Sequence, residues 1–338
     1  MSADSADSLA GSNSARTGSF TDVGWLVDDL LRVEGVMTEA VGSRAHPLVG
    51  EAAMHLIKAG GKRLRPALVL LSSHAGTPGL GPTDLSAAAI ELVHIATLYH
   101  DDVIDETEVR RGVPTVHSKW GIEVAVLSGD YLFARGCALG AEAGGDVPGI
   151  LARAIGEVCE GQIVETASLG DPDRPVDEYL DTIRQKTAAL FRAACELGAE
   201  TSESNSEHRE ALVSYGENLG LAFQIVDDLL DVLGDPEITG KRVGSDLREG
   251  VLTMPFLLAA QKSDRVRAQL AGGERDLSLV LPGLWETAAL AETVGAAAGY
   301  GRAARTALGF LEPGEWRDAL STVVDGVLAQ ASDLPIGS

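Results

Sequence analysis

The sequence has few aromatic residues and few cationic ones. Of its 338 residues, 4% are Phe, Trp or Tyr, and 27 Lys and Arg stand against 50 Asp and Glu, a formal net charge of −23. A nucleic-acid-binding protein needs a basic surface to neutralise phosphates, so this deficit excludes nucleic acid as a partner. Because aromatics are scarce, aliphatic side chains, chiefly Ala and Leu, must build most of the core.

Cysteines and long apolar runs are also rare. The three cysteines, Cys137, Cys159 and Cys195, form no C-x-x-C pair, which predicts free, buried thiols in a reducing cytosol. No stretch approaches the roughly 18 apolar residues of a transmembrane segment. Residues 1–20 lack the basic start and apolar stretch of a secretory signal, and their Ser, Ala and Asp predict a disordered tail. We therefore expect a cytoplasmic protein.

Helix-forming residues fill most of the chain after Gly24, and strand-like alternation is almost absent. Thr83 and Asp84 are candidate caps for a long helix that ends near Ile104. The breaks are short and carry Gly, Pro or Asp, so we expect one all-α domain over residues 21–338. The expected helices cover residues 48–59, 85–104, 121–140, 149–169, 176–200, 207–233, 254–271 and 284–298.

Two acidic clusters carry the strongest chemical signal. Residues 101–105 read Asp-Asp-Val-Ile-Asp and residues 227–231 read Asp-Asp-Leu-Leu-Asp, so each cluster places two carboxylates on one helix face. Both clusters lie near predicted helix C-termini, where the helix dipole disfavours negative charge unless cations neutralise it. Paired carboxylates suit Mg²⁺, which often bridges to substrate phosphates. One such cluster is often a solvated surface, but two that each follow a long apolar helix predict a metal site.

Four short basic clusters accompany the acidic ones. They are Gly60-Gly61-Lys62-Arg63-Leu64-Arg65-Pro66, Arg110-Arg111-Gly112, Gln185-Lys186-Thr187 and Gly240-Lys241-Arg242. Each alone is more often an exposed loop. Together with the acidic clusters they predict a diphosphate substrate held between cationic side chains and metal. These local cations, and not the net charge, decide whether a small anion binds.

The order and spacing of these motifs resemble the trans-isoprenyl diphosphate synthases, or polyprenyl synthetases. The resemblance runs from about residue 60 to residue 255 and also includes Glu91-Leu92-Val93-His94, Phe223-Gln224 and residues 243–247, Val-Gly-Ser-Asp-Leu. It implies a large helical bundle around a deep central cavity, usually a homodimer. It also implies Mg²⁺-dependent condensation of an allylic diphosphate with isopentenyl diphosphate.

The resemblance also implies a role for each matching residue. Binding of Mg²⁺ that bridges the allylic diphosphate falls to Asp101, Asp105 and Asp227. Completion of the two clusters, directly or through water, falls to Asp102, Asp228 and Asp231. The clamp on the same diphosphate consists of Arg110, Lys186 and Lys241. The isopentenyl diphosphate site consists of Lys62, Arg65, His94 and Arg111. The residues that face the developing carbocation are Thr187 and Gln224.

These roles need no protein base. Metal ions and cationic side chains stabilise the diphosphate as the C–O bond breaks, and the allylic cation meets the held isopentenyl double bond. The released diphosphate can take the final proton. His94 therefore needs no acid–base role, and without the resemblance it would be interpreted as a satisfied core histidine. His100 is expected to be structural or to support the Asp pair.

The product length depends on the helix before the first acidic cluster. Only Val103 and Ile104 separate Asp102 from Asp105, as in long-chain members of the family. Ala96 lies five residues before Asp101, about one turn deeper at roughly 1.5 Å per residue, where an aromatic residue would block a growing chain. We predict a medium- or long-chain product, with a geranylgeranyl or shorter product as the alternative. Val251 stands where many members have Lys, which puts one peripheral basic contact in doubt.

Three other classes of protein share parts of this pattern. A class I terpene cyclase has an Asp-rich helix end, but its second motif is usually of an Asn/Ser/Glu type and it needs no isopentenyl site. A non-catalytic partner subunit typically loses one or both Asp motifs, and both are intact here. A helical scaffold would require every motif to be coincidental.

Overall fold

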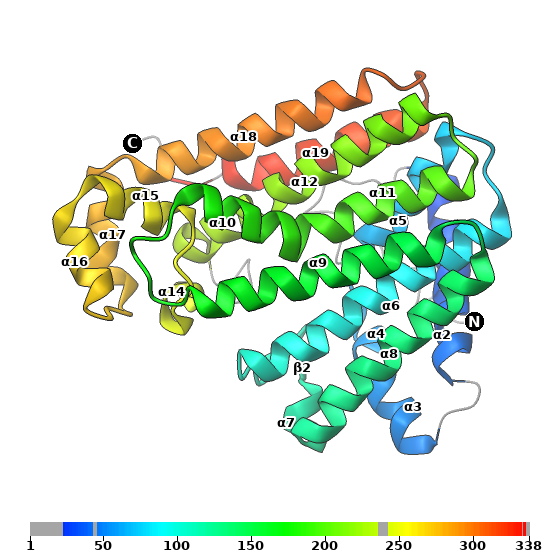
Figure 1. Ribbon diagram of the computed structural model, residues 1–338, viewed down its shortest axis with the longest axis horizontal. Coiled ribbons are helices and arrows are strands. Elements are labelled where there is room, and N and C mark those ends of the chain that lie inside the picture. Colours follow the sequence, from blue (N-terminus) through cyan, green and yellow to red (C-terminus); the bar gives the residue numbers. More distant parts are fainter. Residues whose placement is uncertain (1–22, 43–45, 236–242, 333, 336–338) are drawn as a thin grey trace.

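The computed structural model describes residues 23–42, 46–235, 243–332 and 334–335, and the predicted all-α fold is confirmed. Long helices lie side by side through the molecule (Figure 1). The predicted tail over residues 1–20 and the predicted ligand Lys241 lie outside the described residues. No helix in the described ranges is long and apolar enough to cross a membrane.

The N-terminal half supplies the first acidic cluster and the basic turn before it. Its helices are α2 (Gly24–Gly42), α3 (Pro47–Ala53), α4 (His55–Lys58), α5 (Leu64–Ser72), α6 (Leu80–Ile104), α7 (Val116–Trp120) and α8 (Ile122–Ala143). Two short antiparallel strands, β1 (Val109–Arg110) and β2 (Val113–Pro114), follow α6 and carry Arg110. Helix α6 packs against α2, α5, α8 and α11, so the first acidic cluster is held by a central element.

The C-terminal half supplies the second acidic cluster. Its helices are α9 (Val147–Ala167), α10 (Val176–Ile183), α11 (Ala189–Thr201), α12 (Ser206–Leu233), α14 (Ser245–Glu249), α15 (Met254–Lys262), α16 (Asp264–Ala271), α17 (Leu277–Glu286), α18 (Ala289–Leu308) and α19 (Glu315–Ser332). Helix α12 packs against α11, α18 and α19. It is almost the helix predicted over residues 207–233.

The expected cap at Thr83 and Asp84 is wrong. Helix α6 begins at Leu80, because Pro82 falls in the first turn, where a missing N–H costs nothing. The Asp84 carboxylate instead accepts a hydrogen bond from Arg32 Nε of α2 at 3.1 Å. The side chain that the sequence offered as a cap therefore ties two helices together.

Several predicted helices are interrupted. Residues 48–59 form α3 and α4, and residues 254–271 break at Ser263, whose extended backbone lets its hydroxyl cap α16. Residues 284–298 fall partly in α17 and partly in α18, because Ala288 takes a left-handed conformation between the two helices.

The predicted helix over residues 176–200 contains a π-helical segment, Arg184–Ala188, between α10 and α11. Two glycines let this segment pack closely on its neighbours. A Cβ on Gly161 of α9 would lie 2.7 Å from Lys186 N, and one on Gly220 of α12 would lie 2.5 Å from Ala188 Cα. The π segment, which carries the Gln185-Lys186-Thr187 motif, is therefore held tightly between α9 and α12.

The prediction of free thiols fits the three cysteines, but the prediction that they are buried fits only one. Cys195 is buried in α11, whereas Cys137 and Cys159 lie on exposed faces of α8 and α9.

Candidate active site

Both acidic clusters lie at helix C-termini, as predicted. Asp101 and Asp102 occupy the last turn of α6, and the backbone N–H of Asp105 caps that helix on Asp101 O at 2.8 Å. The second cluster, residues 227–231, lies in the last turns of α12. The C-termini of α6 and α12, each the negative end of a helix dipole, thus carry additional negative charge, which favours a bound cation.

A third acidic residue, Glu165 of α9, links the two clusters. Burial raises the pKa of Asp101 to about 6, with Glu165 among the charges that add to the shift. Burial also raises the pKa of Asp228 to about 7, again with a contribution from Glu165. Glu165 therefore lies within electrostatic reach of both helix ends. Glu165 could not be predicted from the sequence, because a single Glu on an acidic chain carries no spacing signal.

Lys186 projects from the π segment into this acidic region. It forms an ion pair with Glu165. Burial works to lower the pKa of Lys186, but Glu165 and Asp101 outweigh it, and the pKa is raised. Single π turns are frequent at functional sites, because the extra residue per turn redirects the side chains that follow. The result here is a cation held beside the first acidic cluster.

Thr187, the second predicted site residue of the π segment, forms a hydrogen bond to α12. Thr187 Oγ1 donates to Gln224 Oε1 at 2.7 Å, and Gln224 Nε2 donates to Asp228 Oδ1 at 2.8 Å. The buried hydroxyl of Tyr179 on α10 donates to the other carboxylate oxygen, Oδ2. Tyr179 was also missed from sequence. The structure thus brings Thr187, Gln224 and Asp228 together, and adds a tyrosine at the end of the chain of hydrogen bonds.

The six motif aspartates differ in what surrounds them. Asp102 is buried and paired with Arg110, and its Oδ2 is buried without a hydrogen-bond donor. Asp231 accepts from the backbone N–H of Ser245 at 3.0 Å and of Asp246 at 3.2 Å. By contrast, Asp101 and Asp105 are partly exposed, and Asp227 is exposed. Asp102, Asp228 and Asp231 therefore hold protein groups in place at the helix ends.

The residues predicted for isopentenyl diphosphate include two partly buried arginines, Arg65 and Arg111. Arg111 Nη1 donates to Leu56 O at 3.2 Å and to Gly60 O. The guanidinium of Arg65 lies 4.8 Å from the centre of the Phe191 ring, and its Nε is buried without an acceptor. Burial lowers the pKa of Arg65 to about 10. Neither arginine forms an ion pair with a carboxylate of the described residues, so this cluster favours an incoming anion.

His94 of α6 lies among these cations. Burial and the charges of Arg65 and Arg111 hold its pKa well below the usual range, so the imidazole is neutral at pH 7. Lys62 is partly exposed at the basic turn. His100 Nε2 donates to Val126 O of α8 at 3.1 Å, which fits the structural role expected of it.

Arg63, for which no separate role was predicted, anchors the basic turn. It has a left-handed backbone, φ 48°, and its buried guanidinium pairs with Glu91 of α6 at 2.9 Å and with Glu34 of α2. The three cationic side chains of this turn therefore differ in role. Arg63 fixes the turn, which leaves Lys62 and Arg65 as the candidates for contact with substrate.

The donor atoms at the two acidic helix ends fit a hard divalent cation such as Mg²⁺. Within the described ranges, however, no three His, Cys, Asp or Glu side chains converge closely enough to hold a metal by themselves. Mg²⁺ usually keeps several waters and binds through one or two carboxylates plus substrate phosphates. These carboxylates therefore fit a metal ion that is coordinated in part by protein carboxylates and in part by diphosphate oxygens.

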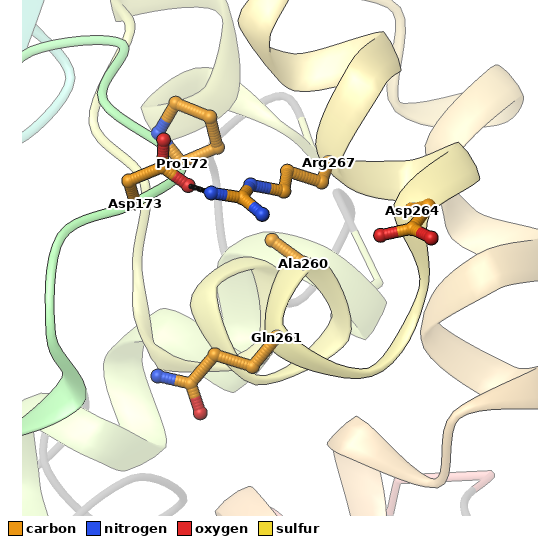
Figure 2. A pocket seen from close by; sticks show the side chains of 6 residues that line it. All are labelled: Pro172, Asp173, Ala260, Gln261, Asp264 and Arg267. Atoms are coloured by element: carbon orange, nitrogen blue, oxygen red, sulfur yellow. Dashed lines mark ion pairs between the residues drawn. The ribbon is translucent and has the colours of Figure 1, made fainter.

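A surface pocket lies away from these residues, between the loop before α10 and helices α15 and α16 (Figure 2). It is lined by Pro172, Asp173, Ala260, Gln261, Asp264 and Arg267. Asp173 and Arg267 neutralise each other in an ion pair at its edge. None of the predicted site residues lines this pocket, so it adds nothing to the candidate active site.

Comparison with known proteins gives one family. The family model described as polyprenyl synthetase matches residues 46–275. Heptaprenyl diphosphate synthase component 2 of Geobacillus stearothermophilus is 44% identical over 257 residues, 75% of this chain and 80% of that protein. Nonaprenyl diphosphate synthase of Mycobacterium tuberculosis (strain ATCC 25618 / H37Rv) is 36% identical over 302 residues, 87% and 90% of the two chains.

A solved structure agrees with these relatives. The polyprenyl synthase of Caulobacter crescentus CB15, complexed with calcium and isoprenyl diphosphate, superposes with a TM-score of 0.85 at 36% identity, over 93% of this chain and 98% of that one. The resemblance, the fold it implied and the expectation of a transferase are thus confirmed. The chain belongs to the polyprenyl synthetase family.

Proposed function

We propose that the protein is a Mg²⁺-dependent trans-prenyltransferase that joins C1 of an allylic diphosphate to C4 of isopentenyl diphosphate and repeats the step. One observation supports the proposal: the molecule has two separate regions whose charged side chains suit a diphosphate. The first is the pair of acidic helix ends beside Lys186, which would bind a diphosphate through metal, and the second is the cluster of partly buried arginines around a neutral histidine. A condensation of two diphosphates requires two such regions.

The allylic diphosphate would bind between the acidic helix ends. Mg²⁺ held by Asp101, Asp105 and Asp227 would neutralise charge on the leaving diphosphate. The clamp would consist of Arg110, Lys186 and Lys241. Asp102 holds Arg110 in place through its ion pair, and Glu165 does the same for Lys186. Both cations are therefore oriented before the substrate arrives, which lowers the reorganisation needed as charge develops.

Isopentenyl diphosphate would bind at the basic turn. Its contacts would be Lys62, Arg65, His94 and Arg111. Arg65 and Arg111 are desolvated, so an anion that reaches them gains more than it would in water. Neutral His94 can donate one N–H without adding to the repulsion among the arginines. Thr187 and Gln224 would face the carbocation, with oxygen atoms to stabilise positive charge.

We propose a medium- or long-chain product, and the printed names of the heptaprenyl and nonaprenyl relatives support it. A geranylgeranyl or shorter product is the alternative. Ala96 is fully buried in α6, five residues before Asp101. Its small side chain would leave more space for a growing tail than a larger residue at this position.

Replacing Ala96 by Val and then by Phe should shorten the product in two steps. Each larger side chain would fill more of the space along α6, and overpacking would cost about 1–3 kcal/mol of stability. Thermal unfolding of both variants would show that they are folded. Chromatographic sizing of the products is the measurement, and an unchanged length distribution in a folded Ala96→Phe protein would show that growth stops elsewhere.

We also propose that the protein works as a homodimer. The outer faces of α8 and α9 expose large aliphatic side chains, among them Leu127 at 66% and Ile163 at 68%. Exposed apolar side chains gathered on adjacent helices are typical of an interface. The Geobacillus relative is named as component 2, which raises the alternative of a different partner subunit. Sedimentation of the purified chain, together with its activity without any added protein, distinguishes the two.

The proposed reaction is tested with purified protein, Mg²⁺, labelled isopentenyl diphosphate and allylic primers of several lengths. Incorporation of label into an extractable polyprenyl product that disappears with EDTA supports it. If no primer is elongated, the chain is a partner subunit that needs a second protein.

A further inference from the structure

We propose that Tyr179 is a positioning residue for the condensation: through Asp228 it fixes the Gln224 amide and, through that amide, the Thr187 hydroxyl. The inference rests on the proposed function, since it concerns how the site stabilises positive charge. It assigns a role to a side chain that contacts neither diphosphate.

The contacts form one continuous chain, which is buried at its Tyr179–Asp228 end and partly buried at Gln224 and Thr187. Tyr179 and Asp228 are 3% and 2% exposed. The tyrosine hydroxyl donates to Asp228 Oδ2, and Gln224 Nε2 donates to Oδ1 at 2.8 Å. Thr187 Oγ1 lies 2.7 Å from Gln224 Oε1. Both carboxylate oxygens of Asp228 are therefore engaged by protein donors.

The direction of each hydrogen bond in this chain follows from the orientation of the Gln224 amide. The Gln224 amide presents its NH₂ group to Asp228 Oδ1, which accepts the hydrogen bond. The amide carbonyl then faces Thr187, and the threonine hydroxyl must donate its proton to that carbonyl. The lone pairs of Thr187 Oγ1 are left to face other groups. A flipped amide would turn its carbonyl towards Asp228 and its NH₂ group towards Thr187, so neither of the two hydrogen bonds would keep its direction.

The fold explains why the anchor is a residue of α10. Tyr179 precedes the π segment and Thr187 lies within it, while Asp228 and Gln224 are one turn apart on α12. Two hydroxyls from one continuous stretch thus hold α12 at two successive turns. Without the tyrosine hydroxyl, Oδ2 would lose its donor, the carboxylate could turn, and the amide would no longer have a single orientation.

A fixed orientation matters because stabilisation of a developing charge depends on dipoles that are already aligned. An allylic carbocation beside Thr187 would meet an oxygen lone pair in the native arrangement. If Thr187 could instead direct its proton at the cation, the interaction would become repulsive. Tyr179 would then affect the rate of ionisation and leave substrate affinity nearly unchanged.

The test compares Tyr179→Phe with Tyr215→Phe. Tyr215 is an equally buried control on α12 whose hydroxyl donates to Leu320 O at 2.8 Å, and no predicted site residue contacts that hydroxyl. We expect Tyr179→Phe to lower kcat about 10- to 100-fold, less than the loss of a direct charge-stabilising group. The KM for isopentenyl diphosphate should stay unchanged, and Tyr215→Phe should retain the wild-type kcat.

A double-mutant cycle shows whether the effect passes through Thr187. In a Thr187→Val background, Tyr179→Phe should have almost no further effect on kcat, because the group that it orients is gone. If the two losses multiply, Tyr179 does not act through Thr187 and the inference is overturned.

Binding gives a readout that does not depend on turnover. The probes are an allylic diphosphate analogue with an ammonium group in place of the cationic carbon, and its uncharged carbon counterpart. Tyr179→Phe should weaken binding of the ammonium analogue several-fold and leave binding of the uncharged analogue unchanged. Equal changes in the two affinities would overturn the inference. A wild-type chain that elongates no primer would overturn the proposed function, whereas an active wild type with Tyr179→Phe indistinguishable from Tyr215→Phe would overturn this inference alone.

Discussion

Asp101→Asn is expected to lower kcat by about two to three orders of magnitude, the range found when one charge-stabilising group is lost. The substitution keeps the shape of the side chain and removes its charge at the end of α6. Asp101 lies within electrostatic reach of Asp105, Lys186 and Glu165, so it belongs to the region where metal and diphosphate would meet.

The control for this variant is Asp318→Asn, a change of the same charge at an exposed position of α19. It should leave kcat unchanged. Direct titration with Mn²⁺ as a spectroscopic substitute for Mg²⁺, in the presence of inorganic diphosphate, should show weaker binding only for Asp101→Asn. Because the pKa of Asp101 is raised to about 6, wild-type metal binding should also weaken as the pH falls below that value. Full activity and full metal affinity in Asp101→Asn would remove Asp101 from the site.

Lys186→Gln should lower kcat about 100-fold or more, because it removes a pre-oriented cation beside the leaving diphosphate. It also leaves Glu165 without its ion-pair partner in a region already rich in carboxylates. The proposed role therefore predicts two separable effects, a loss of charge stabilisation and an added electrostatic repulsion.

Two further variants separate these effects. Lys186→Gln combined with Glu165→Gln removes the unpaired carboxylate, and we expect it to recover thermal stability but little kcat. Lys262→Gln removes an ion pair of the same type with Glu292 at an exposed position, and should change neither. Recovery of kcat in the double variant would mean that Lys186 serves only to neutralise Glu165.

Residues that carry chemistry at a fixed spacing could be predicted from sequence. The two acidic clusters were placed at helix C-termini because the apolar periodicity before them located α6 and α12 closely. The family resemblance gave Thr187 and Gln224 the same role, and in the structure the two side chains are in contact. In these cases the local pattern and the tertiary structure agree, which is what consistent folding requires.

Residues whose role depends on a neighbouring element could not be predicted. Glu165 and Tyr179 become part of the site only because α9 packs against the π segment and α6, and α10 packs against α12, and nothing in their neighbouring sequence indicates this. The π segment was hidden because residues 176–200 have the propensity of one continuous helix. Asp84 was misassigned as a cap because its partner, Arg32, lies 52 residues away.

The central claim is that one chain binds an allylic diphosphate and isopentenyl diphosphate and joins them, with release of the diphosphate group of the allylic substrate. The most direct test measures released inorganic diphosphate and incorporated isopentenyl units in the same reaction, with purified protein, Mg²⁺ and an allylic primer. The proposal predicts one diphosphate released for each isopentenyl unit incorporated, and neither in the presence of EDTA. Diphosphate released from the primer without incorporation of isopentenyl units would contradict it, because the chain would then ionise an allylic substrate but not elongate it.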